Sequence, residues 1–151
     1  MRLSFAAAFA LVFSSSLGAQ SIPDLGTATP IAGNWSYAPS TDGGEAVFAN
    51  ASGYPQLWVH CTRGTRRVTI ALPAAAAVPV VDVWTSSMTR MVTPSFSASA
   101  GRTSVDFTNY DPLLDALSNS RGRIGFALGN QPPLVVPAWP EIARVVEDCR
   151  A

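Results

Sequence analysis

The stretch from Gln56 to Leu72 decides the fold, and it reads Gln-Leu-Trp-Val-His-Cys-Thr-Arg-Gly-Thr-Arg-Arg-Val-Thr-Ile-Ala-Leu. Successive side chains of a β-strand point to opposite faces of a sheet. In the first half, this period of two places three apolar side chains on one face, namely Leu57, Val59 and Cys61. Trp58 and His60 then lie on the other face. The alternation predicts a strand over 56–62 that is buried on one side.

The second half of the stretch repeats the pattern after a turn at residues 63–66, which read Arg-Gly-Thr-Arg. Val68, Ile70 and Leu72 point one way, and the residues between them point the other way. Two such strands joined by a short glycine-containing turn are typical of a β-hairpin. We therefore expect the strands 56–62 and 67–72 to pair antiparallel, with both apolar faces in the core.

Outward from this hairpin, the chain continues in short runs rich in β-branched and aromatic residues, separated by Gly, Pro, Asn and Ser. This pattern is typical of an all-β domain. We place further strands near 35–38, 45–49, 80–85, 90–93, 103–108 and 123–128. The prediction is a mainly β chain: a single antiparallel β-sandwich-like domain over 34–151, with two short helices, the C-terminal one packed on a sheet. Residues 20–33 are dense in turn formers and are predicted to be a flexible N-terminal arm.

Two helices interrupt the strand pattern. Asp111-Pro112 predicts the first helix, because Asp caps a helix N-terminus and Pro suits the first helical position. The second is expected from Trp139 to Asp148. Its apolar positions recur at helical spacing and form one stripe, which consists of Ile142, Val145, Val146 and Cys149.

The chain has two cysteines, and each one lies on a predicted apolar face. Cys61 belongs to the buried side of its strand, and Cys149 belongs to the buried stripe of the last helix. In an oxidising compartment only one intramolecular pairing is available to them. We therefore predict a structural Cys61–Cys149 disulfide. A reactive pair or a metal site is the alternative, but it lacks a Cys-x-x-Cys spacing and a second histidine, so no metal or other cofactor is predicted.

The N-terminus has the pattern of a secretory signal peptide over residues 1–19. Arg2 provides a positive charge, an apolar run follows from Leu3 to Val12, and small residues lead to Ala19. Cleavage after Ala19 fits best, Gly18 is a second position, and a retained N-terminal anchor is the alternative. The pattern predicts a periplasmic or secreted bacterial protein, without stable membrane insertion once the signal is removed.

The charge of the chain argues against two classes of partner. Basic and acidic residues balance at ten each, and no run of like charge occurs. Proteins that bind nucleic acid or anionic membranes through their charge usually present a basic surface. We therefore expect no nucleic-acid partner.

His60 is the sole histidine and is the natural centre of any hydrolytic site. It cannot form a dyad with Cys61, because adjacent strand residues face opposite sides of the sheet. A triad with a distant Ser and either Asp82 or Asp106 is a second interpretation, since triads are defined by geometry and not by order. The chain has no Gly-x-Ser-x-Gly elbow. The simpler expectation is an outward-facing His60 beside Trp58, and no catalytic residue is predicted.

Other candidate sites have a structural explanation beside the functional one. Arg121 and Arg123 offer two guanidinium groups next to Gly122, and they are our candidate contact for an anion or a partner protein. Gly122 also suits the end of the preceding helix. Asp111 and Asp115 lie four residues apart and resemble a carboxylate pair, but a cap and a first-turn acid account for both. Trp58 and Trp84 suit either an exposed aromatic surface or packing.

The region from Gln56 to Cys149 resembles small exported proteins of alphaproteobacteria and is more distantly similar to the invasion-associated locus B proteins. Three segments carry the resemblance: Asp111-Pro112-Leu113-Leu114-Asp115-Ala116-Leu117, Ser120-Arg121-Gly122-Arg123 and Pro137-Ala138-Trp139-Pro140-Glu141-Ile142. In those proteins a β-sandwich-like body leads to a strand like Phe126-Ala127-Leu128-Gly129 and then to a terminal helix. The resemblance implies a periplasmic or secreted, non-enzymatic role.

Together, these observations predict a non-enzymatic binding or accessory protein of the bacterial envelope, whose partner is a protein or another envelope component. A hydrolase built around His60 is one alternative. An inhibitor-like protein that acts on a partner protein through the surface around Arg121 is another.

Overall fold

The computed structural model describes residues 27–129 and 131–151. Within these ranges the chain forms ten strands and two helices. In chain order they are β1 (Gly33–Ser40), β2 (Gly43–Asn50), β3 (Pro55–Thr62), β4 (Arg67–Pro73), β5 (Val81–Trp84), β6 (Thr89–Val92), β7 (Ser95–Ser97), β8 (Arg102–Thr108), α1 (Pro112–Ser118), β9 (Arg123–Leu128), β10 (Leu134–Pro137) and α2 (Glu141–Arg150). None of the helices in this part of the chain is long and apolar enough to cross a membrane.

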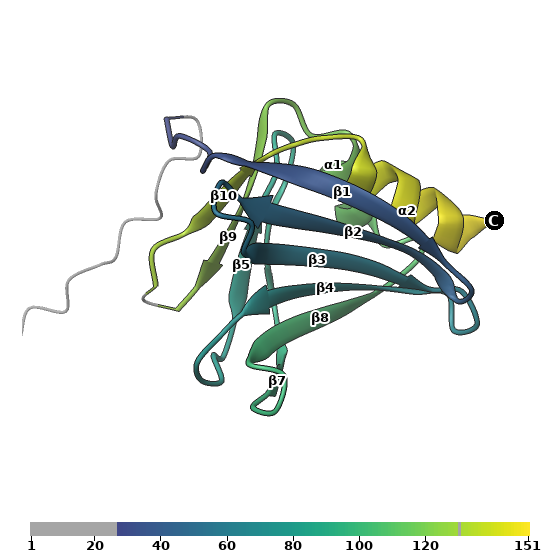
Figure 1. Cartoon of the computed structure of the whole chain (residues 1–151), viewed down its shortest axis with the longest axis horizontal. Helices are drawn as coiled ribbons and strands as arrows, with labels where there is room; N and C mark the ends of the chain where they lie inside the picture. Colours follow the sequence, from purple (N-terminus) through teal and green to yellow (C-terminus); the bar gives the residue numbers. More distant parts are fainter. Residues whose placement is uncertain (1–26, 130) are drawn as a thin grey trace, which may run out of the picture.

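The strands form two antiparallel sheets that face each other. The larger sheet has the order β1-β2-β3-β4-β8-β7, and the smaller sheet has the order β10-β9-β5-β6. Figure 1 shows the larger sheet in front and the smaller one behind its left-hand part, with α1 and α2 at the right. The smaller sheet covers one part of one face of the larger sheet, and the two helices cover another part of the same face. The predicted mainly β, sandwich-like fold is confirmed.

The hairpin predicted over residues 56–72 is present, and its apolar side chains face inward as expected. β3 pairs antiparallel with β4, and Cys61 lies opposite Val68. The six apolar side chains predicted to face inward are at most 2% exposed. Arg66 turns the chain with a φ of 52°, a left-handed conformation that ends the connection between the strands.

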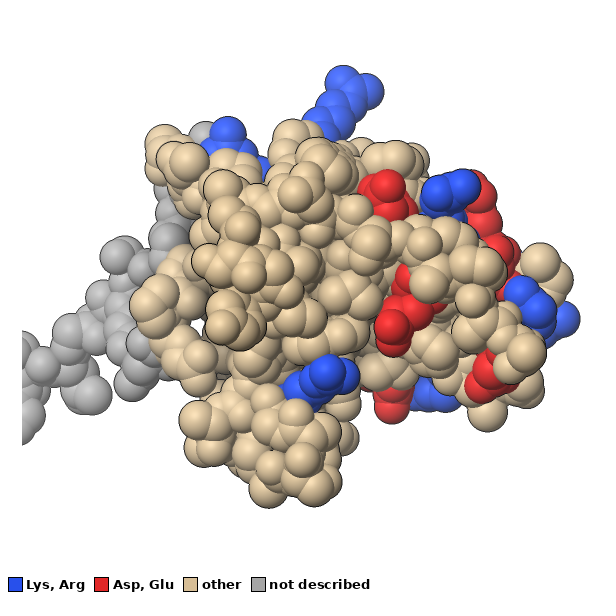
Figure 2. Space-filling view, in the orientation of Figure 1, with Lys and Arg blue, Asp and Glu red and all other residues tan. Residues whose placement is uncertain are grey.

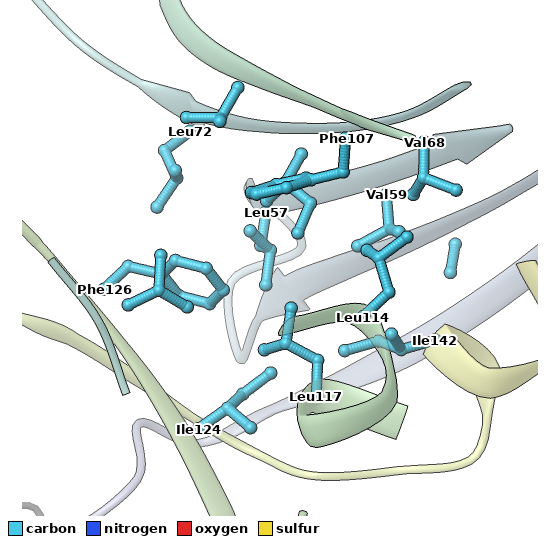
Figure 3. Packing of buried hydrophobic residues seen from close by; sticks show 14 of the residues in the cluster. Leu57, Val59, Val68, Leu72, Phe107, Leu114, Leu117, Ile124, Phe126 and Ile142 are labelled. Atoms are coloured by element: carbon cyan, nitrogen blue, oxygen red, sulfur yellow. The ribbon is translucent and has the colours of Figure 1, made fainter. Parts of the chain in front are cut away.

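The core lies between the larger sheet and everything that covers it. Figure 3 shows Leu57, Val59, Val68, Leu72 and Phe107 of the larger sheet above a second layer. Ile124 and Phe126 of β9 and Leu114, Leu117 and Ile142 of the helices make up this layer. Because the strands of the smaller sheet are short, helical side chains are needed to complete the core.

Both predicted helices are present, and the second one is shifted. Asp111 caps α1, and its side chain accepts a hydrogen bond of 2.8 Å from the Leu113 amide. α2 begins at Glu141 instead of Trp139, because Pro140 occupies the cap position. It ends at Arg150, and its buried stripe is the predicted one.

Two strands were not predicted, and the expected arm is partly tied to the body. β7 has three residues, too few to recognise as a strand, and β10 follows Pro133, ends at Pro137 and does not alternate. The Ile31 amide donates to the Val135 carbonyl at 2.8 Å, and the Arg123 guanidinium donates to the Ala28 carbonyl. The first bond uses a carbonyl on the outer edge of β10, and the second uses an arginine side chain of β9. The predicted signal peptide and residues 20–26 lie outside the described residues.

Candidate functional site

A cavity of about 260 Å³ opens at one end of the sandwich, and we call it the end cavity. It is lined by Ile31, Gln56, Leu72, Pro73, Leu128, Gln131, Pro132, Pro133 and Leu134. Most of these side chains are apolar, two are neutral amides, and none is charged. The end cavity can therefore surround a small apolar group and offer it a few neutral hydrogen-bonding partners.

The ends of several strands make the walls of the end cavity. β4 ends at Pro73 and β9 ends at Leu128, while β10 begins at Leu134. Pro132 and Pro133 lie in the connection between β9 and β10, and proline has no backbone N–H with which to extend a strand pairing. The ladder of the smaller sheet accordingly stops at Leu134 opposite Phe126, and the connecting loop forms the rim.

Beside the end cavity, an arginine stacks on the outer face of the larger sheet. The Arg102 guanidinium carbon lies 3.6 Å from the centroid of the Trp58 ring, which is a close cation–π contact. Arg102 lies opposite Pro73, a residue that lines the end cavity. In the described ranges the ion pairs found are His60–Glu45, Arg90–Asp111 and Arg150–Asp115, so Arg102 has no carboxylate partner there.

His60 lies on the outer face of the larger sheet, half-buried, as the sequence predicts. Its Nδ1 is 3.8 Å from Oε2 of Glu45, the residue opposite it on β2. Asp106 accepts a 2.5 Å hydrogen bond from the Thr69 hydroxyl. Asp82 belongs to the other sheet. The structure thus brings Glu45 to His60, and it brings neither Asp82 nor Asp106 there. Asp106 lies two strands away from His60, on the far side of Thr69.

Arg121 and Arg123 follow the turn after α1 and lie at the start of β9, at the opposite end of this strand from the end cavity. Arg123 is engaged with the Ala28 carbonyl. Arg121 is exposed, and its backbone amide donates to the Ser86 hydroxyl at 3.1 Å. Gly122 has a φ of 80°, but it does not close the helix as expected, because the C-cap of α1 is Asn119. Its left-handed conformation belongs to the turn that leads into β9. An anion or partner contact at Arg121 and Arg123 stays a prediction.

Asp111, which caps α1, and Asp115 of α1 form ion pairs with different arginines. Arg90 reaches Asp111 through two contacts of 2.8 and 3.0 Å, and Arg150 reaches Asp115 at 2.8 Å. Burial would raise the pKa of Asp111, but hydrogen bonds from Arg90 and the Leu113 amide, together with the charge of Arg90, lower it overall. The carboxylates hold the helix in place and do not share a ligand. No cluster of three or more metal-binding side chains occurs among residues 27–129 and 131–151.

α2 is attached to the larger sheet at its last turn. The sulfur atoms of Cys61 and Cys149 lie 2.10 Å apart, at disulfide distance, and the two Cα atoms are 5.5 Å apart. The Asn109 side chain donates to the Cys149 carbonyl at 3.1 Å. The Tyr37 hydroxyl donates to Asp148, and this hydrogen bond is the main reason why the pKa of Tyr37 is raised.

Of the two predicted tryptophan positions, Trp84 is 3% exposed and belongs to the core, whereas Trp58 is half-buried on the outer face. The end cavity was not predicted from the sequence. Its lining comes from five separate segments, and only the paired prolines at 132–133 marked one of them as a break in the strand pattern.

No family model matches the chain, and neither the curated proteins nor the solved structures include a significant match to it.

Proposed function

We propose that this chain is an exported, non-enzymatic binding protein of the bacterial envelope, and that it holds a small, mainly apolar ligand in the end cavity. The observation that carries the proposal is the end cavity itself, an opening of about 260 Å³ with apolar walls and two amide side chains. Small-molecule sites are usually concave and mainly apolar, with a few polar groups that orient the ligand.

The size of the end cavity limits the ligand. An apolar cavity of about 150 Å³ in a protein core binds one benzene. By proportion, the 260 Å³ of the end cavity suits a group of roughly ten non-hydrogen atoms. Leu72 and Leu128 are already buried at its base, so a ligand would extend the core instead of displacing part of it. Export rests on the signal pattern of residues 1–19 and on the paired cysteines.

The test is binding of 1-octanol, a neutral chain of suitable length, to the mature protein. We expect the methyl signals of Leu72, Leu128 and Leu134 to shift in NMR titrations, with saturation. Ile31→Trp fills the end cavity and should weaken binding at least tenfold. Met91→Trp is the matched control, because Met91 is 70% exposed and lies on β6, away from the lining. Unmoved methyl signals at saturating octanol contradict the proposal.

The non-enzymatic part of the proposal has its own test. Glu45 is the acid nearest to His60, and their 3.8 Å separation is longer than a hydrogen bond. We expect purified mature protein to show no turnover of generic ester, peptide or glycan substrates. Turnover that disappears in His60→Ala would replace the binding proposal with the hydrolase alternative.

A further inference from the structure

The Arg102–Trp58 stack on the outer face of the larger sheet adds a charge to the rim of the end cavity. From it we infer that the ligand is a medium-chain carboxylate, a free fatty acid whose tail enters the end cavity and whose carboxylate binds Arg102. This inference rests on the proposed function, since it assigns the chemistry of the same site.

The register of the strands places the stack next to the end cavity. Pro73 lines the cavity and lies opposite Arg102 on β8. Gln56 also lines the cavity and precedes Trp58 by two positions on β3. Residues two apart share a face of the sheet and are separated by about 7 Å along the strand. A charged head group bound at the Arg102–Trp58 stack would therefore lie about 7 Å from the residues that line the end cavity.

The state of Arg102 favours an anion. Its guanidinium has no carboxylate within ion-pair distance among residues 27–129 and 131–151. The guanidinium carbon lies 3.6 Å from the centroid of the Trp58 ring, and a cation–π contact of this kind leaves the N–H groups able to bind a ligand. Stacking also reduces the side-chain freedom that binding would otherwise remove. A planar guanidinium fork matches the two oxygens of a carboxylate.

Among residues 27–129 and 131–151, the charges near the end cavity do not oppose an anion. The residues that line the end cavity include no acid. Figure 2 shows every acidic group visible in this view toward the right, whereas the left of the surface, over the end of the sandwich, is mainly uncharged. A carboxylate at the rim would accordingly meet one favourable charge and little repulsion. A neutral or cationic head group would gain nothing from Arg102.

The experiment compares octanoate with 1-octanol, because the two have the same chain and differ in the head group. Isothermal titration at low salt should show octanoate binding about tenfold more tightly, the effect of a charge-assisted hydrogen bond at a partly exposed site. In Arg102→Met the preference should disappear, with octanol affinity unchanged. Arg102→Lys should retain part of it, because the charge stays and the fork is lost. The preference should also shrink at high salt.

Arg63→Met is the matched control. It removes one exposed guanidinium from the turn after β3, at the opposite end of this strand from Gln56. It should leave the octanoate preference intact, and thermal unfolding of each variant checks that it is folded. Equal affinity for octanol and octanoate in the wild type overturns the carboxylate inference and leaves the proposed function standing. If the wild-type protein binds neither octanol nor octanoate and the methyl signals of the end cavity do not shift, the proposed function is overturned.

Discussion

At the scale of single residues, the attachment of α2 depends on a glycine. Gly44 is buried on β2 beneath the Tyr37–Asp148 hydrogen bond. A Cβ atom there would lie 2.8 Å from Cε2 and from the hydroxyl oxygen of Tyr37, and it would overlap the Asp148 carboxylate. Arg144 adds a cation over the same tyrosine ring, 4.9 Å from its centroid. The absence of a side chain at Gly44 is what lets α2 and β1 meet.

Gly44→Ala should therefore lower the free energy of unfolding by about 2 kcal/mol, the usual cost of overpacking a filled site. Urea unfolding followed by circular dichroism measures the change. Gly64→Ala is the control, because the nearest atom to its added Cβ is 3.8 Å away. Equal stability of the two variants would show that the Tyr37–Asp148 contact does not depend on Gly44.

Asp111 should make the stability of the fold depend on pH in acid. Its folded pKa lies below the ordinary value of 3.8. A carboxylate with a depressed folded pKa stabilises the fold fully above its unfolded pKa, and this contribution is lost as the pH falls through the lower folded pKa. Asp111→Asn removes the charge that pairs with Arg90 but keeps a capping side chain. Replacing Asp111 by Ala removes both and should cost about 1–2 kcal/mol at pH 7.

The measurement is the free energy of unfolding of wild type and both variants between pH 7 and pH 2. The difference between wild type and Asp111→Asn should shrink as the pH falls below about 4. Arg90→Met tests the partner of this ion pair. Combined with Asp111→Asn, it should lower the free energy of unfolding little further, because the charge that Arg90 pairs with is already gone. A difference that stays constant down to pH 2 would mean that the charge of Asp111 does not stabilise the fold.

At the scale of elements, the main long-range link joins β3 to α2. The Cys61–Cys149 pair is separated by 88 residues in the sequence. Closing a loop of this length restricts the unfolded chain and should stabilise the fold by about 4–5 kcal/mol on the chain-entropy model. α2 also packs on β2, β3 and β4 through its apolar stripe, so it has a docking site without the bond.

Cys149→Ser should lower the free energy of unfolding by about 4–5 kcal/mol, because the disulfide is lost. The double variant Cys61→Ser, Cys149→Ser should have the same free energy of unfolding as the single variant, because the same bond is missing in both. Alkylation without reductant followed by mass spectrometry should find both cysteines of the exported protein unmodified and linked. Two alkylated cysteines in that sample would contradict the disulfide.

Elements also show where sequence patterns stop being informative. β3, β4 and β8 alternate clearly and were predicted to within a residue or two, because each has one buried and one outer face. β10 is four residues long and has no such alternation, since both Val135 and Val136 are buried. It is a strand because β9 pairs with it, and a partner of this kind is not visible in a local pattern.

At the scale of the whole molecule, export is the property on which the predicted disulfide depends, because disulfides form in oxidising compartments. The small-residue exit at the end of the apolar run favours cleavage after Ala19. Protein recovered from the periplasm or medium of an expressing bacterium should have an intact mass that begins at Gln20, whereas retention of the full N-terminus would support the anchor alternative. A variant with Leu11→Arg, which breaks the apolar run, should stay uncleaved.

The sequence by itself determined the fold class, the buried face of the central hairpin, the two helices and the pair of cysteines. These features follow from the periods of strand and helix, which are local and are written in consecutive residues. The tertiary structure alone decided the end cavity, the stacking of Arg102 on Trp58 and the row that joins Glu45 to His60. Each of these brings together residues from different strands, and their proximity depends on strand order and register, which no single stretch of the chain specifies.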